Sequence, residues 1–390
     1  MHAQPLNLAQ IMLTNSKLQC QLASSLAVRA CAQPRRHRSM IRTPCVGYRF
    51  VYGPRSPNVQ AGGRSPFRGL CRWGWLLVIA LLAGCAGRGP RRLTVGAEDY
   101  RPLSRVARAY GLTLTVEHHQ HARLTRTPWL IELQADSRRA RVNGVVVWLH
   151  QPVVKHRNHL VMAVVDVETV LDPLLRPARH LTAVERPRVL IDPGHGGSDP
   201  GARGATGITE KELVLRLGRK VANRLAAVGI EVALTRDADD TLSLAERVEL
   251  TATADLLVSL HLNAAVNPAA QGIETYLLPA AGQPGTADPG GNDRPAATAG
   301  NSFDGANQVL GYLLQQALLH ATGGEDRGLR RARFFLLRTA PCPAVLVEAG
   351  FLSHAAEEQR WLDPAYREQV ADGIVTGIRA YLALTEKGKR

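Results

Sequence analysis

The stretch that decides the fold runs from Arg188 to Gly204 and reads Arg-Val-Leu-Ile-Asp-Pro-Gly-His-Gly-Gly-Ser-Asp-Pro-Gly-Ala-Arg-Gly. Its apolar run, Val189 to Ile191, is bounded by turn residues, which predicts a buried strand. A glycine-rich loop with a single histidine, His195, follows the strand. Glycine lacks a Cβ atom, so the loop can bend sharply and let other groups approach the histidine closely. Because sites in open α/β sheets form beyond the carboxyl ends of strands, we expect a functional site at His195.

Two other predicted strands also lead into side chains that can carry chemistry. The run 255–260 is followed by His261, and the run 344–347 is followed by Glu348. Glu210 stands at the start of a predicted helix, where it is also typical of an acid that favours the helix dipole. Two histidines and one carboxylate are the protein ligands of one common type of catalytic zinc site. A further carboxylate is then available as the base. For Glu348 the alternative role is a hydrogen-bond partner of a ligand histidine.

Seven sequence blocks are similar, in the same order, to those of a known family. They are Ile191–Gly197, Glu210–Leu213, Thr235–Asp237, Leu244–Arg247, Ser259–Ala264, Gly272–Tyr276 and Pro343–Ser353. Over residues 187–384 the chain therefore resembles the zinc-dependent N-acetylmuramoyl-L-alanine amidases of the type called amidase 3. Seven ordered blocks are a far more specific signal than one short motif.

The resemblance implies both a metal site and a reaction. It implies that His195, Glu210 and His261 bind Zn²⁺ and that Glu348 is the catalytic base. The implied reaction is hydrolysis of the amide between N-acetylmuramic acid and L-alanine in peptidoglycan. Two other functions stay open: a non-catalytic peptidoglycan-binding lipoprotein, and a zinc peptidase that acts within the stem peptide. The sequence disfavours the non-catalytic protein because all four positions are filled.

Strands alternate with helices through residues 187–384, which predicts an α/β catalytic domain. We expect a mostly parallel or mixed sheet of about six strands with helices on both faces. The predicted strands are 189–191, 230–234, 255–260, 273–278, 334–337 and 344–347, and helices are expected to begin at Glu210, Ser243, Asp304 and Pro364. Arg236 and Arg247 are expected to make structural ion pairs.

The stretch 279–300 is rich in Gly, Pro and Ala and is long for a connection in a compact domain. Some relatives carry an inserted helix here that blocks the zinc until a protein activator moves it, so an activator is a candidate partner. Because this stretch is poor in helix formers, we expect a flexible flap instead.

Residues 93–183 predict a small α+β accessory domain before the catalytic domain. Leu103 to Tyr110 has helical spacing, and several alternating segments after it read as strands. The pattern loosely resembles the N-terminal domain of copper amine oxidases and of some cell-wall proteins, and we expect a spacer or a wall contact without copper chemistry. His118, His119 and His121 could bind a metal, but a solvated polar turn is favoured because such clusters are weak signals.

The net charge of +15 is concentrated at the start of the chain. Residues 1–84 hold eleven of the 48 basic residues and no acidic residue, which leaves 37 basic against 33 acidic residues, or +4, in residues 85–390. This mild excess gives no electrostatic footprint for nucleic acid, and it suits an anionic polymer such as peptidoglycan.

Residues 1–66 lack hydrophobic periodicity and predict a disordered or mis-annotated extension, with translation beginning near residue 59. Residues 67–85 combine arginines, an apolar run and Leu-Ala-Gly-Cys, which resembles a bacterial lipoprotein signal with Cys85 lipidated. An internal apolar segment is the alternative. We therefore expect an exported, periplasmic lipoprotein, anchored to a membrane through Cys85 in the cell envelope. Cys342 is expected to be a small core residue.

Overall fold

The computed structural model describes residues 93–287 and 295–387, so the expected extension, the signal segment and Cys85 lie outside the described residues. We call residues 93–183 the N-terminal region and residues 187–384 the C-terminal region. Among the described residues, no helix is long and apolar enough to cross a membrane.

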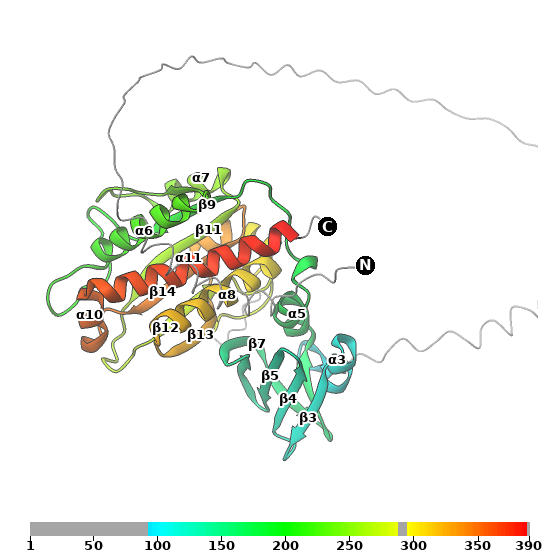
Figure 1. Cartoon of the computed structure of the whole chain (residues 1–390). Helices are drawn as coiled ribbons and strands as arrows, with labels where there is room; N and C mark the ends of the chain where they lie inside the picture. Colours follow the sequence, from blue (N-terminus) through cyan, green and yellow to red (C-terminus); the bar gives the residue numbers. More distant parts are fainter. Residues whose placement is uncertain (1–92, 288–294, 388–390) are drawn as a thin grey trace, which may run out of the picture. The chain divides into compact units, whose positions relative to one another are not determined.

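The N-terminal region is mainly antiparallel sheet with one regular helix of eight residues (Figure 1). Its strands are β1 (Leu93–Val95), β2 (Glu98–Pro102), β3 (Thr113–Glu117), β4 (His121–Arg126), β5 (Trp129–Gln134), β6 (Ser137–Val142), β7 (Val145–His156) and β8 (His159–Ala163). Its helical segments are α3 (Leu103–Tyr110), α4 (Val164–Asp166) and α5 (Asp172–Leu175), with a π-helical turn at Val167–Leu171 and a 3₁₀ turn at Pro177–Arg179. The predicted helix ends where Gly111 adopts φ 62°, the left-handed conformation that glycine tolerates.

The C-terminal region alternates strands and helices as expected. Its strands are β9 (Arg188–Pro193), β10 (Glu231–Leu234), β11 (Leu256–Asn263), β12 (Ile273–Leu277), β13 (Asp326–Arg331) and β14 (Ala344–Phe351). Its helices are α6 (Glu210–Ala227), α7 (Leu244–Leu250), α8 (Asp304–Thr322), α9 (Phe335–Thr339), α10 (Ala355–Leu362) and α11 (Pro364–Lys387), with 3₁₀ turns at Thr251–Thr253 and Ala299–Phe303. The capping boxes of Thr209 with Glu212 and of Ser243 with Glu246 begin α6 and α7.

One prediction in this region was wrong. Residues 334–337 were expected to form a strand, but the strand is β13, and Phe335–Thr339 is the short helix α9. Leu336 and Leu337 are buried in α9, whereas Phe334 precedes the helix and is exposed. Periodicity alone cannot distinguish a helix from a strand over so few apolar residues. The true strand carries three arginines and shows little apolar pattern.

The sheet is larger than the six strands expected. The strand order is β10-β9-β11-β14-β12-β13-β7-β6-β5-β4-β3. The pairs β10–β9, β9–β11, β11–β14 and β12–β13 are parallel, and β12 runs antiparallel to β14, so the sheet is mixed. It continues into the N-terminal region because β13 pairs with β7 at Leu329 and Val147.

Helices cover both faces of the C-terminal strands, as expected. Alternate residues of a strand point to opposite faces, and Val189 and Ile191 join one apolar cluster while Leu190 joins another. The first cluster includes residues of α6, α8 and α11, and the second includes residues of α9, together with Cys342. Cys342 is 3% exposed, which confirms it as a core residue. The sheet is thus held rigidly from both sides, and its strand ends are fixed in space.

Candidate active site

Three of the four predicted site residues converge on one point. His195 lies in the loop after β9, Glu210 is the first residue of α6, and His261 lies near the end of β11. The Nε2 atom of His195 is 3.1 Å from Glu210 Oε1, and the Nδ1 atom of His261 is 2.9 Å from the same oxygen. One ligand atom from each side chain lies within 4.8 Å of the others. We call His195, Glu210 and His261 the His-Glu-His cluster.

The protein holds the carboxylate of Glu210 in place from several sides. Glu210 is 3% exposed and accepts hydrogen bonds from the main-chain N–H groups of Leu262, at 2.9 Å, and Ala202, at 2.8 Å. Burial opposes its ionisation, but the hydrogen bonds of the two histidines outweigh burial and hold its pKa well below the usual range. Glu210 is therefore a fixed anion that can attract a cation.

Asp199 orients the ring of His195, and the sequence interpretation missed this residue. Asp199 Oδ2 lies 2.7 Å from His195 Nδ1, which leaves Nε2 to face Glu210. Burial lowers the pKa of His195, but the hydrogen bonds of Glu210 and Asp199 outweigh burial and raise it. A carboxylate behind a metal-binding imidazole is a common arrangement because it fixes the ring and its tautomer.

Two glycines leave room for the cluster. A Cβ atom on Gly194 would lie 2.2 Å from His261 Cε1, and one on Gly201 would lie 2.5 Å from Glu210 Oε2. Neither distance is compatible with a side chain, so the loop between β9 and α6 needs glycine at both positions for close approach to the cluster. His195 itself has φ 58°, a left-handed backbone that is uncommon outside glycine.

Two arginines brace the loop that carries His195. Arg247 pairs with buried Asp192 at 2.5 Å and donates to the carbonyl oxygen of His195, which confirms the expected structural ion pair. Arg236 instead donates to the carbonyl oxygens of Pro193 and Gly194, at 3.0 and 2.7 Å. Both side chains satisfy backbone groups that a tight loop leaves without regular partners.

Glu348 lies beside the cluster but not in it. It belongs to β14, opposite His261 of β11 in the parallel register, and lines the same pocket. Among the described residues, its Oε2 atom has no hydrogen-bond partner. Burial raises the pKa of Glu348 well above its ordinary value, and the negative charges of Glu210 and Glu274 add to the rise.

Glu274 is a second buried acid that the sequence interpretation did not single out, although it lies within the block Gly272–Tyr276. It is 1% exposed on β12, and its Oε1 accepts hydrogen bonds from Arg327 and Arg330, both at 2.6 Å. Asn263 donates to its Oε2 at 3.1 Å, so Asn263 braces the strands next to His261. An acid inside a predicted buried strand, after Ile273, was the available signal.

The cluster opens into a pocket of about 640 Å³, a size typical of ligand sites. Phe334 and Leu244, 38% and 55% exposed, form part of its apolar wall. The expected flap contributes no described residue to this lining. Instead, residues 279–287 bind the N-terminal region: His150 Nε2 accepts from Ala280 N at 3.1 Å, and Arg138 donates to the carbonyl oxygen of Gly285. Residues 288–294 lie outside the described residues.

The histidines His118, His119 and His121 of the N-terminal region, for which a solvated polar turn was favoured over a metal site, form no group of potential metal ligands among the described residues. His118 and His119 lie in the turn between β3 and β4 with φ of 50° and 55°, and both are exposed. Among the described residues, the His-Glu-His cluster is the one group of three or more potential ligands close enough to hold an ion.

Comparisons with known proteins agree with the block pattern. The Amidase_3 family, described as N-acetylmuramoyl-L-alanine amidase, matches residues 189–380. N-acetylmuramoyl-L-alanine amidase AmiC of Neisseria meningitidis serogroup B is 33% identical over 220 residues, which cover 50% of this chain and 53% of AmiC. N-acetylmuramoyl-L-alanine amidase AmiA of Salmonella typhimurium is 30% identical over 50% of this chain and 75% of AmiA.

Solved structures give a corresponding match. The crystal structure of N-acetylmuramoyl-L-alanine amidase from Clostridium difficile 630 is 35% identical, with a TM-score of 0.44, over 51% of this chain and 98% of that one. The chain thus spans about half the length of AmiC and nearly all of the C. difficile chain.

Proposed function

Because the chain belongs to the Amidase_3 family, we propose that it is an N-acetylmuramoyl-L-alanine amidase. Its reaction is hydrolysis of the amide between N-acetylmuramic acid and L-alanine in peptidoglycan. The observation that carries the proposal is the convergence of His195 and His261 on one oxygen of Glu210, beside the unpaired carboxyl of Glu348, in an open pocket.

The donor set suits a zinc ion. Two imidazole nitrogens and one carboxylate oxygen are a known ligand set of catalytic zinc sites, which keep a fourth position open. His195 Nε2, His261 Nδ1 and the carboxylate of Glu210 would hold the ion, and Asp199 would fix the ring of His195. When bound, zinc supplies a Lewis acid that polarises the scissile carbonyl and lowers the pKa of water.

Glu348 is the general base in this proposal. It accepts a proton from the attacking water and returns it to the amide nitrogen as the carbon–nitrogen bond breaks. The water oxygen stays on the lactyl carbonyl, so the products are a carboxylate on the sugar and a peptide with a free L-alanine amine. Burial moves the pKa of Glu348 upward, toward the range in which a carboxyl can both accept and release a proton.

The pocket also suits the substrate's shape. Phe334, Leu244 and Leu336 offer apolar surface beside the cluster, where the methyl groups of the lactyl and alanyl units can pack. The pocket is open to solvent, which suits access by an extended polymer.

The location of the protein follows from the substrate. We place it in the cell envelope, exported and anchored through lipidated Cys85, where peptidoglycan is its partner. The motif Leu82-Ala-Gly-Cys85 supports the anchor, and the detection of a diacylglyceryl group on Cys85 by mass spectrometry is the test. A protein activator remains a candidate partner.

The decisive experiment for the activity combines metal and product analysis. The purified full chain should bind about one zinc per molecule and release intact stem peptides with free L-alanine from peptidoglycan; a chelator should abolish turnover and zinc should restore it. Glu348→Ala should keep its zinc and lose turnover, while Glu249→Ala, an exposed acid on α7, should resemble the wild type. Shortened peptides would show a peptidase instead, and unchanged peptidoglycan with bound zinc would show a non-catalytic binding protein.

A further inference from the structure

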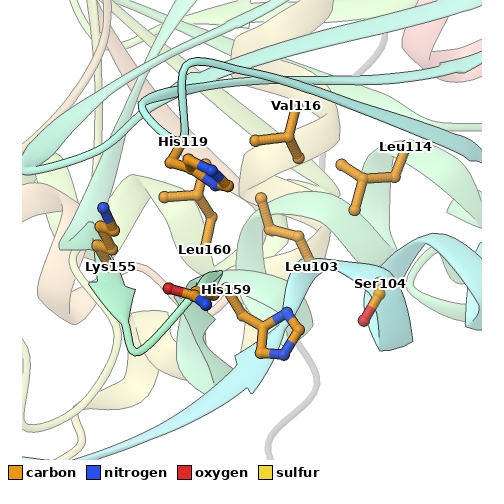
Figure 2. A pocket seen from close by; sticks show the side chains of 9 residues that line it. Leu103, Ser104, Leu114, Val116, His119, Lys155, His159 and Leu160 are labelled. Atoms are coloured by element: carbon orange, nitrogen blue, oxygen red, sulfur yellow. The ribbon is translucent and has the colours of Figure 1, made fainter.

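The N-terminal region contains a cavity of about 170 Å³ that belongs to no part of the candidate active site. It lies where α3, β3 and the turn between β7 and β8 meet, and Figure 2 shows the side chains around it. The cavity has room for roughly six water molecules. Its volume is well below the several hundred cubic ångströms of a pocket that encloses a whole small molecule. A short terminal segment of a larger molecule fits this volume.

The floor of the cavity is aliphatic. Leu103 and Leu160 are 1% and 4% exposed, and Leu114 and Val116 of β3 complete the apolar surface. Val116 is 41% exposed, so a ligand would cover apolar surface that now faces solvent. Covering such surface favours a small aliphatic group.

The rim of the cavity carries basic groups. Lys155, His119 and His159 all line it and are exposed. Within residues 93–287 and 295–387, none of these three side chains makes a hydrogen bond or ion pair, and no carboxylate lines the cavity. Glu117, next to Val116 in β3, pairs with Arg123 at 3.0 Å. The cavity therefore selects an anion.

A metal ion is a poor occupant for the same rim. Figure 2 shows His119 and His159 on different sides of the cavity, with Leu160 between them. Neither imidazole belongs to a group of three potential ligands among the described residues. Because the basic rim and the aliphatic floor belong to one small cavity, we expect a ligand that carries an anionic group next to an aliphatic group.

We propose that this cavity binds the carboxyl-terminal end of a peptide, with the carboxylate at Lys155 and a small aliphatic side chain on the floor formed by Leu103 and Leu160. The choice of a peptide among carboxylates rests on the proposed function, because that substrate carries peptides. The cavity then holds the protein on its polymer while a different peptide occupies the active site.

Binding of two matched probes to the full chain tests the proposal. The probes are N-acetyl-lysyl-D-alanyl-D-alanine as the free acid and as the carboxyl-terminal amide, measured by isothermal titration calorimetry with the chelated Glu348→Gln protein. The acid should bind about tenfold more tightly than the amide, because a charge-assisted hydrogen bond is lost in the amide. Equal affinity of the two probes would overturn the proposal.

Variants locate the binding. Lys155→Gln should weaken binding of the acid about tenfold, and Val116→Asp, which adds a negative charge at the floor, should abolish it. Arg157→Gln is the matched control, because Arg157 follows Lys155 by two residues, in the turn between β7 and β8, and does not line the cavity. If Lys155→Gln and Val116→Asp bind as Arg157→Gln does, the peptide lies elsewhere and the proposal is wrong.

Turnover separates this proposal from the amidase assignment. Lys155→Gln in the otherwise wild-type chain should keep its kcat on a soluble muramyl peptide. Hydrolysis without selective binding of the acid would refute the cavity proposal and leave the amidase assignment intact. Selective, Lys155-dependent binding of the acid in a protein that does not hydrolyse peptidoglycan would support the cavity proposal and refute the amidase assignment.

Discussion

Glu274 and Glu348 lie directly opposite each other in the antiparallel pair of β12 and β14, and both are buried. Their surroundings differ in one respect. Two arginines, Arg327 and Arg330, share Oε1 of Glu274, whereas Oε2 of Glu348 has no partner among the described residues. One carboxylate is neutralised by structure, and the other is left available for chemistry at a cost in stability.

We predict that Glu348→Gln stabilises the metal-free protein at neutral pH. Burial, Glu210 and Glu274 raise the pKa of Glu348 in the folded state above its unfolded value near 4.5. A raised folded pKa gives stability that is present at low pH and is lost as the pH rises through it. The neutral amide carries no charge, so the gain should grow from pH 5 to pH 8 and reach about 1–3 kcal/mol, the order of the extra penalty for a buried charge over a buried neutral group.

Thermal unfolding of chelated protein at several pH values measures this gain. Glu274→Gln is the control with the opposite expectation, because it leaves Arg327 and Arg330 without their shared anion and should destabilise the fold. A Tm of Glu348→Gln equal to that of the wild type at every pH would show that the burial of Glu348 costs nothing.

Asp199 should matter for metal affinity rather than for folding. Asp199→Ala removes the acceptor 2.7 Å from His195 Nδ1 and frees the ring, so zinc affinity should fall about 10–100-fold. The zinc affinity of Asp199→Asn should lie between those of Asp199→Ala and the wild type, because the amide oxygen can still accept the hydrogen bond. Competition with a fluorescent chelator measures the affinity. Asp237→Asn is the control, because Asp237 forms an exposed ion pair with Arg219. If Asp199→Ala binds zinc as tightly as Asp237→Asn does, the orientation of His195 by Asp199 has no effect on zinc affinity.

The convergence of His195, Glu210 and His261 could be predicted because these residues lie at the ends of elements with strong local signals. The strand 189–191, the capping box at Thr209 and the run before His261 each fix one of these side chains locally. Parallel pairing of β9 with β11 and of β11 with β14 then brings these ends together.

What the sequence did not predict depends on contacts between distant segments. The sheet continues past β13 because one edge strand meets β7, about 180 residues earlier in the chain, and β13 itself has no apolar pattern. The roles of Asp199 and Glu274 depend on which side chains surround them after folding, not on their neighbours in sequence. The first part of the expected flap, residues 279–287, binds the N-terminal region through His150 and Arg138, which no local pattern indicates.

Gly194 tests how tightly the loop must approach the cluster. In Gly194→Ala the new Cβ would lie 2.2 Å from His261 Cε1, so either the ring or the loop must move. We expect zinc affinity and turnover to fall together by at least tenfold, since a displacement of about 1 Å can cost a hundredfold in rate. Gly285→Ala is the control, where a Cβ meets only the Arg331 carbonyl oxygen at 3.1 Å. Normal zinc binding by Gly194→Ala would show that the close approach is not needed.

Phe334 should bind the substrate without taking part in the chemistry. Its ring is 38% exposed in the pocket wall and packs edge-on against Tyr276 at 5.2 Å, so it presents a fixed apolar surface. Losing this surface in Phe334→Ala should cost about 1–2 kcal/mol of binding and raise KM roughly five- to thirtyfold with kcat unchanged.

A control variant and a rescue variant test the role of the Phe334 ring. Leu362→Ala removes an apolar side chain of similar exposure, 37%, that does not line the pocket, and it should leave KM unchanged. Phe334→Tyr keeps the ring and should restore KM. A fall in kcat at constant KM in Phe334→Ala would instead mean that the ring contacts the reacting groups in the transition state, because only such contacts change kcat without changing substrate binding.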